Sequence, residues 1–129
     1  MIYTNNTEYQ IYYYQTSDTK HTPVLEYIQN LSFKEKVKTV NYINLLQRFK
    51  GYIGEPYSRY ICSGIRELRI NFSHNNHRIF YIIVEERKII LLHAFLKKTR
   101  KTPPKEIKRA LNNFNDYQLY KSYIEYEET

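Results

Sequence analysis

The amino-acid sequence predicts an α+β protein in which one antiparallel sheet carries a two-helix hairpin on one face and a helix near the C-terminus. Apolar residues recur at helical spacing through residues 22–50, whereas residues 65–95 form three strand-like segments joined by short turns. The 129 residues match the length of one domain, and 42% of them are hydrophobic, which is enough for a single core. We therefore expect one domain over residues 1–129, with a core over about 9–115.

The N-terminal half predicts a strand followed by two helices. The β-prone aromatic residues of 9–15 indicate the strand, and Thr22 with Pro23 offers a helix start. Ser32 opens a capping box for a second helix, which is expected to stop at Gly51. This helix is expected to bury one apolar stripe, made of Phe33, Val37, Val40, Ile43, Leu46 and Phe49.

The C-terminal half predicts three strands and a helix, which gives the order β-αα-βββ-α. Residues 65–73 alternate between apolar and polar side chains, 78–84 are apolar on both faces, and 88–95 form the third strand. Their short connections favour antiparallel hairpins. A Thr-Pro-Pro signal then starts a helix over about 105–114, while weak periodicity indicates a flexible tail over 116–129.

The positive charge of the chain is concentrated in one segment. The sequence has 20 Lys and Arg against 13 Asp and Glu, a formal net charge of +7. Residues 87–109 contain only Glu106 as an acidic residue against nine basic ones, namely Arg87, Lys88, Lys97, Lys98, Arg100, Lys101, Lys105, Lys108 and Arg109. Such a field attracts a polyanion, of which nucleic acid is the most common in a cell. A solvated basic helix is the alternative explanation.

Export and membrane insertion are not expected. Cys62 is the one cysteine, so the chain cannot form an internal disulfide. No apolar run approaches the roughly 18 residues that a membrane-spanning helix needs. The first ten residues, MIYTNNTEYQ, lack the basic and apolar segments of a signal peptide. We therefore expect a cytoplasmic protein with no membrane partner.

The side chains that could carry chemistry are cations on the predicted sheet. The sequence has no GxSxG elbow, P-loop or HExxH motif, and we expect neither a metal nor a cofactor. Arg66, Arg69 and Arg78 lie in neighbouring strands, and Lys97 and Lys98 follow the third, so we expect them to converge on the uncovered face of the sheet or its rim. Fixed cations there could stabilise the charge that develops when an RNA 2′-hydroxyl attacks phosphorus. Salt bridges to nearby glutamates are the alternative explanation.

Several strings of the sequence carry a family resemblance. They are Gly54-Glu55-Pro56, SGIRELR from Ser63, HRIFY from His77, LLHAFLKKTRKTP from Leu91, and Glu106-Ile107. Together they resemble the phage-derived Gp49-like/HigB branch of the RelE/ParE toxins, over about residues 9–115, and the run from Leu91 is the most specific part. The resemblance implies a RelE-like fold in the β-αα-βββ-α order that the patterns indicate independently. It also implies the toxin of a type II toxin–antitoxin system.

For the site, the resemblance implies cleavage of mRNA without a metal, usually on the ribosome. Arg78 matches the family's strand arginine, basic residues after the last strand match Lys97 and Lys98, and Arg69 is a third cation. The expected catalytic residues are Arg78, Arg69, Lys98 and His93. The expected RNA-binding residues are Arg66, Lys97, Lys98, Arg100 and Lys101.

The chain also departs from the family pattern. Glu67 stands where RelE has a catalytic cation, and the family's C-terminal stacking tyrosine matches Tyr117 or Tyr120 only loosely. The general base is left open. His93 is a candidate by chemistry, but its alternation with Ile89, Leu91 and Phe95 favours a core histidine.

The expected function is an endoribonuclease toxin that inhibits translation. Its expected partners are mRNA, the ribosome and a cognate antitoxin, a helix-turn-helix protein encoded next to it. A gyrase poison of the ParE kind and a phage accessory RNA-binding protein are the alternatives, since fold alone does not decide function. Arg78 is expected to be needed for toxicity and little needed for folding.

Overall fold

The computed structural model describes residues 8–127, within which the chain forms three helices and six strands. In chain order these are β1 (Gln10–Tyr14), α1 (Pro23–Gln29), α2 (Phe33–Arg48), β2 (Ser58–Cys62), β3 (Ile65–Phe72), β4 (Asn75–Val84), β5 (Lys88–Leu96), α3 (Pro104–Tyr120) and β6 (Tyr123–Glu125). The expected α+β class is confirmed. Outside the described residues lie 1–7 and 128–129. The expectation that the chain has no signal peptide concerns the first of these ranges. Between residues 8 and 127, no helix has the length and hydrophobicity that a bilayer crossing requires.

The six strands form one sheet in the order β2-β3-β4-β5-β1-β6. β1 runs parallel to β5, with Tyr12 opposite Ile90, whereas the other neighbouring pairs are antiparallel. A wholly antiparallel sheet was expected, and the sheet is mostly antiparallel with one parallel pair. A parallel pair needs a long crossover connection, and the helices and hairpins between β1 and β5 supply it.

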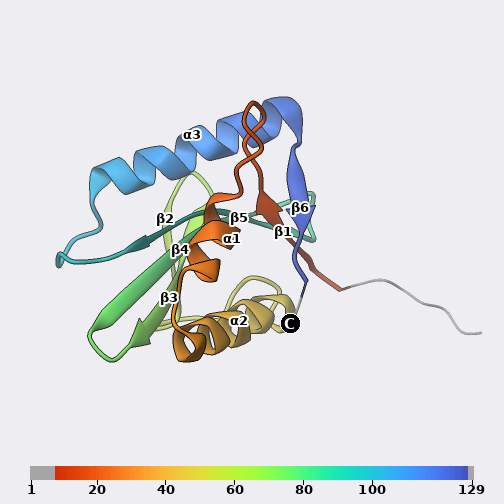
Figure 1. Ribbon diagram of the computed structural model, residues 1–129. Coiled ribbons are helices and arrows are strands. Elements are labelled where there is room, and N and C mark those ends of the chain that lie inside the picture. The colour runs from red at the N-terminus through yellow and green to blue at the C-terminus, as the bar shows by residue number, and fades with distance from the viewer. Residues whose placement is uncertain (1–7, 128–129) are drawn as a thin grey trace, which may run out of the picture.

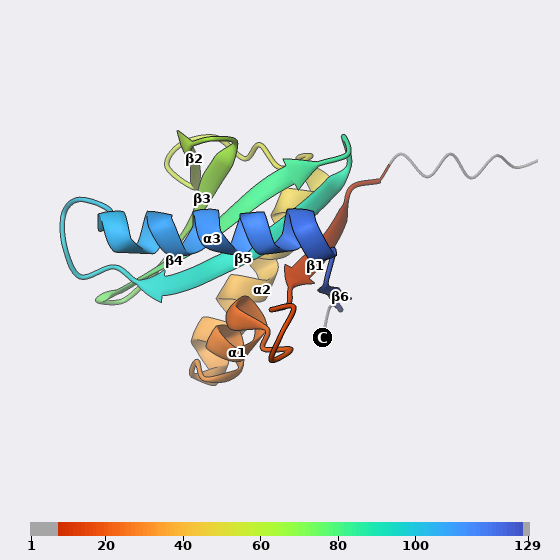
Figure 2. The ribbon, with the colours of Figure 1, turned by 90° about the horizontal axis from the view of Figure 1, so that it is seen from above.

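Helices cover both faces of this sheet. Figure 1 shows α3 on one side and α2 on the other, and the view from above in Figure 2 shows α3 crossing over the strands with α1 and α2 beneath them. The core on the α1–α2 side includes Val24, Ile28, Ile43, Leu46, Leu68 and Tyr81. The core on the α3 side includes Phe80, Ile90, Leu92, Ala110 and Tyr117. The face that was expected to be uncovered is thus covered by α3, because α3 has an apolar stripe of its own.

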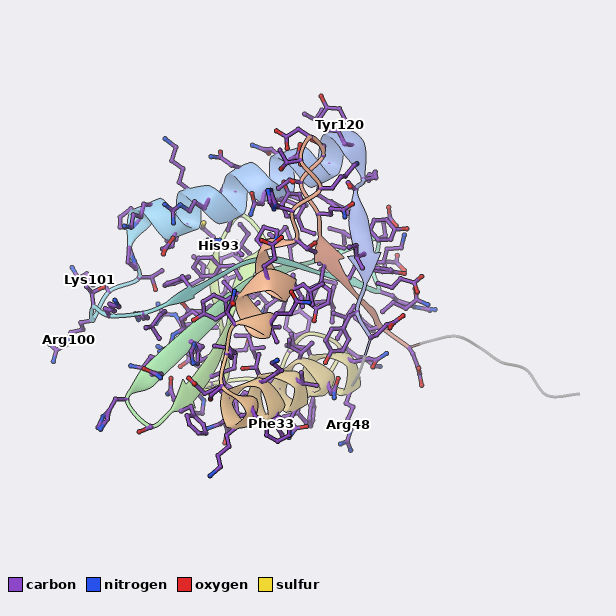
Figure 3. The ribbon with its side chains drawn as sticks, in the orientation of Figure 1. Phe33, Arg48, His93, Arg100, Lys101 and Tyr120 are labelled. Carbon is purple, nitrogen blue, oxygen red and sulfur yellow. The ribbon has the colours of Figure 1, made fainter. Side chains whose placement is uncertain are left out.

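Helix α2 buries only part of its predicted apolar stripe. Its buried residues are Glu35, Thr39, Ile43 and Leu46, of which Ile43 and Leu46 were expected. Phe33, Val37 and Phe49 are exposed, which corrects the expected stripe, and Phe33 lies on the outer side of the helix in Figure 3. The reason is that the Glu35 carboxylate hydrogen-bonds to β4, and a helix turns about 200° between residues two apart.

Strand β2 is an element that the sequence patterns did not predict. It pairs with β3 through a two-residue turn, in which Ser63 and Gly64 have φ angles of 50° and 84°. Two successive residues with positive φ are typical of the tightest β-hairpin turns, whose twist matches that of the strands. β2 consequently forms one edge of the sheet.

The C-terminal segment is also more regular than expected. α3 continues to Tyr120, and β6 pairs with β1, with Ile124 opposite Tyr13. The Asp116 carboxylate accepts hydrogen bonds from the Tyr14 hydroxyl (2.6 Å) and from the backbone N–H of Ser17 (2.9 Å). These contacts join residues about one hundred positions apart, so local periodicity could not reveal them.

A chain of side-chain hydrogen bonds connects α1, α2 and β4. The Tyr27 hydroxyl lies 2.6 Å from Nδ1 of His77, and Nε2 of His77 lies 2.5 Å from Oε2 of Glu35. Glu35 also accepts from the Ser32 hydroxyl (2.7 Å) and the Asn75 side-chain amide (3.1 Å), and its backbone N–H donates to the Ser32 hydroxyl oxygen, which confirms Ser32 as the N-cap of α2. The hydrogen bond to His77, and next the one from Ser32, lower the pKa of Glu35 from 4.5 to about 2.

This pKa predicts a loss of stability in acid. A carboxyl whose pKa is lower in the folded state stabilises the fold above its unfolded pKa, and this contribution is lost as the pH falls. We expect the free energy of unfolding to decrease between pH 4.5 and 2 more steeply for the wild type than for Glu35→Gln. Urea unfolding across this range measures the difference. Parallel curves for the two proteins would contradict the assignment.

Candidate active site

The pairing of β3 with β4 places two arginines side by side. Arg69 lies directly opposite Arg78 in the register. Side chains alternate along a strand, and Leu68 and Ile79 belong to the core on the α1–α2 side, so both arginines project to the α3 side. The sequence-based expectation for Arg69 and Arg78 is met by this geometry: they lie together, away from the two-helix hairpin.

The Glu67 carboxylate lies between these arginines and the loop before α3. Oε1 of Glu67 is 3.4 Å from Nε of Arg69 and 3.8 Å from Nε of Arg78, and Oε2 accepts a hydrogen bond from the Thr102 hydroxyl (3.3 Å). The Glu67 side chain is 0% exposed. Sequence reasoning treated Glu67 as a departure from the family pattern. Its alternation with Arg69 on one strand was the signal that could have assigned it to the same cluster.

Arg78 is held more rigidly than an exposed cation would be. Its Nη1 donates to the side-chain oxygen of Asn71 and to the backbone oxygen of His77, both at 2.9 Å. Only 6% of its side chain is exposed, and burial, with Glu67 acting in the opposite direction, lowers its pKa. Arg78 is therefore also part of the folded interior, contrary to the expectation that folding needs it little.

Lys97 completes the cluster from the loop that follows β5. Burial lowers its pKa, the Glu67 carboxylate opposes this shift, and the positive charges of Arg78, Arg69 and Arg59 add to it. Arg59 enters from β2, where it lies opposite Glu67 in the register. Four cations thus surround one carboxylate, with a formal excess of three positive charges.

Two open grooves flank Lys97. The first, of about 370 Å³, is lined by Arg59, Ile61, Lys97, Arg100, Lys101, Thr102 and Ile107. The second, of about 550 Å³, is lined by His74, Asn75, Asn76, Leu96, Lys97, Lys98, Thr99 and Arg100. Arg100 and Lys101 project from the tip of the loop in Figure 3. Lys98 therefore lines the second groove and is not part of the arginine cluster.

The cationic segment of the sequence divides into two places in the structure. Arg87 and Lys88 lie at the start of β5, whereas Lys97 follows its end, and a nine-residue strand spans roughly 30 Å. The first turns of α3 add the exposed Lys105, Lys108 and Arg109 to the loop. Only the part from Lys97 onward is close to the arginine cluster.

His93 lies apart from the cluster. A β-bulge shifts the register between β4 and β5, so that His93 pairs with Phe80 and faces α3, on the side opposite Ile89 and Leu91. Its Nε2 lies 3.0 Å from Oε1 of Glu106, and burial lowers its pKa. Phe80 separates it from Glu67, a distance of two strand spacings or about 10 Å. His93 is thus paired with Glu106 and lies two strands away from Glu67.

Two other expectations are corrected by position. Arg66 shares the face of Leu68, where it contacts Tyr52 and Tyr81, so it does not converge with Arg69 and Arg78. The sequence parity already contained this answer.

The tyrosines suggested for base stacking also lie elsewhere. Tyr117 is buried in the core beside α3. Tyr120 ends α3, about 24 Å from its first residue, and Figure 3 shows it at the opposite end of the helix from Arg100 and Lys101.

This arrangement is suited to hold a phosphodiester. Guanidinium groups form charge-assisted hydrogen bonds with phosphate oxygens. The buried Nε atoms of Arg69 and Arg78 face Glu67, so a phosphate would have to meet the other nitrogens of these guanidinium groups. Across residues 8–127, no three His, Cys, Asp or Glu side chains gather closely enough to hold a metal ion. Fold and site together define a small α+β protein with a cationic rim that is braced by one buried carboxylate.

Comparison with known protein families assigns the chain to one of them. Residues 26–115 match the family described as phage-derived protein Gp49-like (DUF891). The match covers more than half of the chain, and the chain belongs to this family, which is one of toxin-like proteins. No curated protein matches the chain.

The ion pair predicts that replacing Arg78 lowers the free energy of unfolding more when Glu67 is present than when it is replaced by Gln. Arg78→Ala leaves the buried Glu67 carboxylate with one arginine fewer, so we expect the free energy of unfolding to fall by about 3 kcal/mol. In a Glu67→Gln background the same substitution should cost clearly less, since no buried negative charge then needs a partner. Urea unfolding of the four proteins measures this coupling. Equal costs in both backgrounds would show that Glu67 and Arg78 do not stabilise each other.

Proposed function

We propose that this protein is the toxin of a type II toxin–antitoxin system and that it cleaves mRNA as an endoribonuclease. The observation that carries the proposal is the pair of arginines fixed opposite each other around buried Glu67, with a surplus of positive charge. Membership of a toxin-like family and the resemblance to HigB and RelE toxins support it. The activity would act in the cytoplasm, where translated mRNA is found.

The proposed reaction is attack of an RNA 2′-hydroxyl on the adjacent phosphorus. The 2′-oxygen forms a bond to phosphorus, the 5′-oxygen leaves with a proton, and the products are a cyclic phosphate and a 5′-hydroxyl. Negative charge grows on the non-bridging oxygens during this step, and Arg69 and Arg78 would stabilise it there. Glu67, which is fully buried, would hold the two guanidinium groups in place without touching RNA.

Lys97 is the group that we propose for proton transfer. It lines the first groove together with Arg59 and Arg100 and feels the charges of Arg69 and Arg78, and its lowered pKa brings its neutral form closer to physiological pH. We prefer Lys97 to His93 in this role because Glu106 and the rings of Phe80 and Phe95 occupy the surroundings of His93. Lys98, Arg100 and Lys101 would contact the RNA backbone outside the cluster.

A cognate antitoxin is part of the proposal, because a cell must restrain such an activity. We propose that it covers the loop and the start of α3, where Lys105, Lys108 and Arg109 are exposed, with acidic and apolar side chains. Binding to the two-helix hairpin, where Phe33 and Val37 are exposed, is the alternative.

Arg78→Lys is the sharpest test of the activity. Lysine keeps the charge near Glu67 but lacks the planar fork that binds two phosphate oxygens, so the fold should persist while cleavage slows on the order of 100-fold. The wild type should arrest growth on induction, primer extension should map new 5′ ends in mRNA, and co-expression of the adjacent gene should restore growth.

The contrary outcomes are informative. Full toxicity of Arg78→Lys at matched expression would remove Arg78 from the reaction. Growth arrest with intact mRNA and damaged DNA would instead favour the gyrase-poison alternative. Primer extension with and without translating ribosomes would establish whether cleavage depends on the ribosome.

The outer cations predict a change in salt dependence. Each phosphate contact on a single strand contributes about 0.7 to the slope of log affinity against log salt concentration. Replacing Lys98 and Arg100 with Ala should flatten the slope for single-stranded RNA by about 1 to 1.5 units. Lys34→Ala, an exposed cation on α2, serves as the matched control and should leave the slope unchanged. An unaltered slope in the double variant would show that these two residues are merely solvated.

A further inference from the structure

The edge strand β2 carries an exposed aromatic cluster that the cleavage site does not use. Tyr60 lies opposite Arg66 in the β2–β3 register, so their side chains share one face. The Arg66 guanidinium lies over the ring of Tyr52, 5.0 Å from its centroid. Tyr60 is 57% exposed and Tyr52 is 61% exposed. Arg66 thus has two solvent-exposed tyrosines, Tyr52 and Tyr60, as its neighbours.

These side chains are held in place before any ligand arrives. The Tyr60 hydroxyl accepts a hydrogen bond from the backbone N–H of Gly64 in the β2–β3 turn (3.2 Å). Nε of Arg66 donates to the hydroxyl of buried Tyr81 (3.4 Å). A fixed ring with an open face loses little conformational entropy when a flat ligand stacks on it.

The cluster is continuous with the phosphate site across the sheet edge. Arg59 and Tyr60 are consecutive residues of β2, with α-carbons about 3.8 Å apart. Arg59 faces the Glu67 side and Tyr60 faces the Arg66 side. A strand of RNA that leaves the arginine cluster over this edge therefore meets Tyr60 next.

We propose that Tyr60, Arg66 and Tyr52 form a stacking site for the unpaired bases that flank the phosphate held by the arginine cluster. The inference rests on the proposed RNA-cleaving function and adds the single-stranded nature of the substrate. Aromatic rings interleaved with cations are the surface that single-stranded nucleic acid requires, because every base has a face that can stack. Arg66 keeps its role in RNA binding, on a different face from the one first expected.

The absence of tryptophan from the sequence makes the proposal directly measurable. Tyr60→Trp introduces a single indole, and its fluorescence should be quenched saturably by a short single-stranded oligoribonucleotide in which 2′-O-methyl groups prevent cleavage. Tyr120→Trp is the matched control, because Tyr120 is similarly exposed (65%) at the far end of α3. Its fluorescence should not respond.

Affinity supplies the second readout. Tyr60→Ala should weaken binding of the same oligonucleotide at least about fivefold, since stacking of one base contributes on the order of 1 kcal/mol or more. Tyr60→Phe should retain most of the affinity because stacking needs the ring and not the hydroxyl. Because Tyr60 is exposed, we expect the variants to keep the melting temperature of the wild type. An equal melting temperature excludes a folding defect as the cause of weaker binding.

The outcomes separate this inference from the proposed function. Unchanged affinity in Tyr60→Ala, with normal cleavage, would overturn the stacking site but not the proposed nuclease activity. Pairing of a strand from another protein along the β2 edge would then be the better explanation of this surface. Quenching of the Tyr60→Trp protein without any cleavage of natural RNA would support the stacking site and overturn the nuclease. No binding of RNA by the wild type would overturn both.

Discussion

The buried carboxylate of Glu67 is the constraint on which the cationic rim depends. Pairing of β3 with β4 sets Arg69 directly opposite Arg78, and like charges in that position destabilise a sheet. A negative charge on the same face, two residues along β3, offsets this repulsion, and its burial limits screening by salt. The guanidinium groups are thereby fixed before a ligand binds, and the surplus positive charge is available to an anion from outside.

Local patterns were sufficient for the elements whose causes are local. Strict alternation identified β3, and the Ser32 capping box identified the start of α2. β2 had a local signal too, the Ser63-Gly64 turn, which was not used. The pairing of β6 with β1 joins the two ends of the chain and leaves no local trace. The orientation of α2 depends on the hydrogen bond between Glu35 and β4, which an apolar stripe cannot express.

The site was predictable to the extent that alternation holds. Arg69 and Arg78 were expected to converge because their strands are neighbours, and they do share one face. Alternation along β3 would have placed Arg66 on the other face with Leu68. The β-bulge before His93 breaks the parity count, so its environment could be known only from the pairing of β4 with β5. The charge run of 87–109 misled in a different way, because an extended strand carries its two ends far apart.

Burial of both sheet faces explains why the site lies at a rim. Figure 2 shows α3 on one side of the sheet and α2 on the other. The β2 edge and the loop of residues 97–103 supply Arg59 and Lys97 to a groove beside the arginine cluster. Under the proposed function, a flexible single strand can bend over this edge, placing a phosphate on the Arg59 face and a base on the Tyr60 face. A duplex keeps its bases paired and stacked inside, so it could contact only one of these faces. If the proposed function holds, this narrow edge would select single-stranded RNA by shape, without hydrogen bonds that read a base sequence.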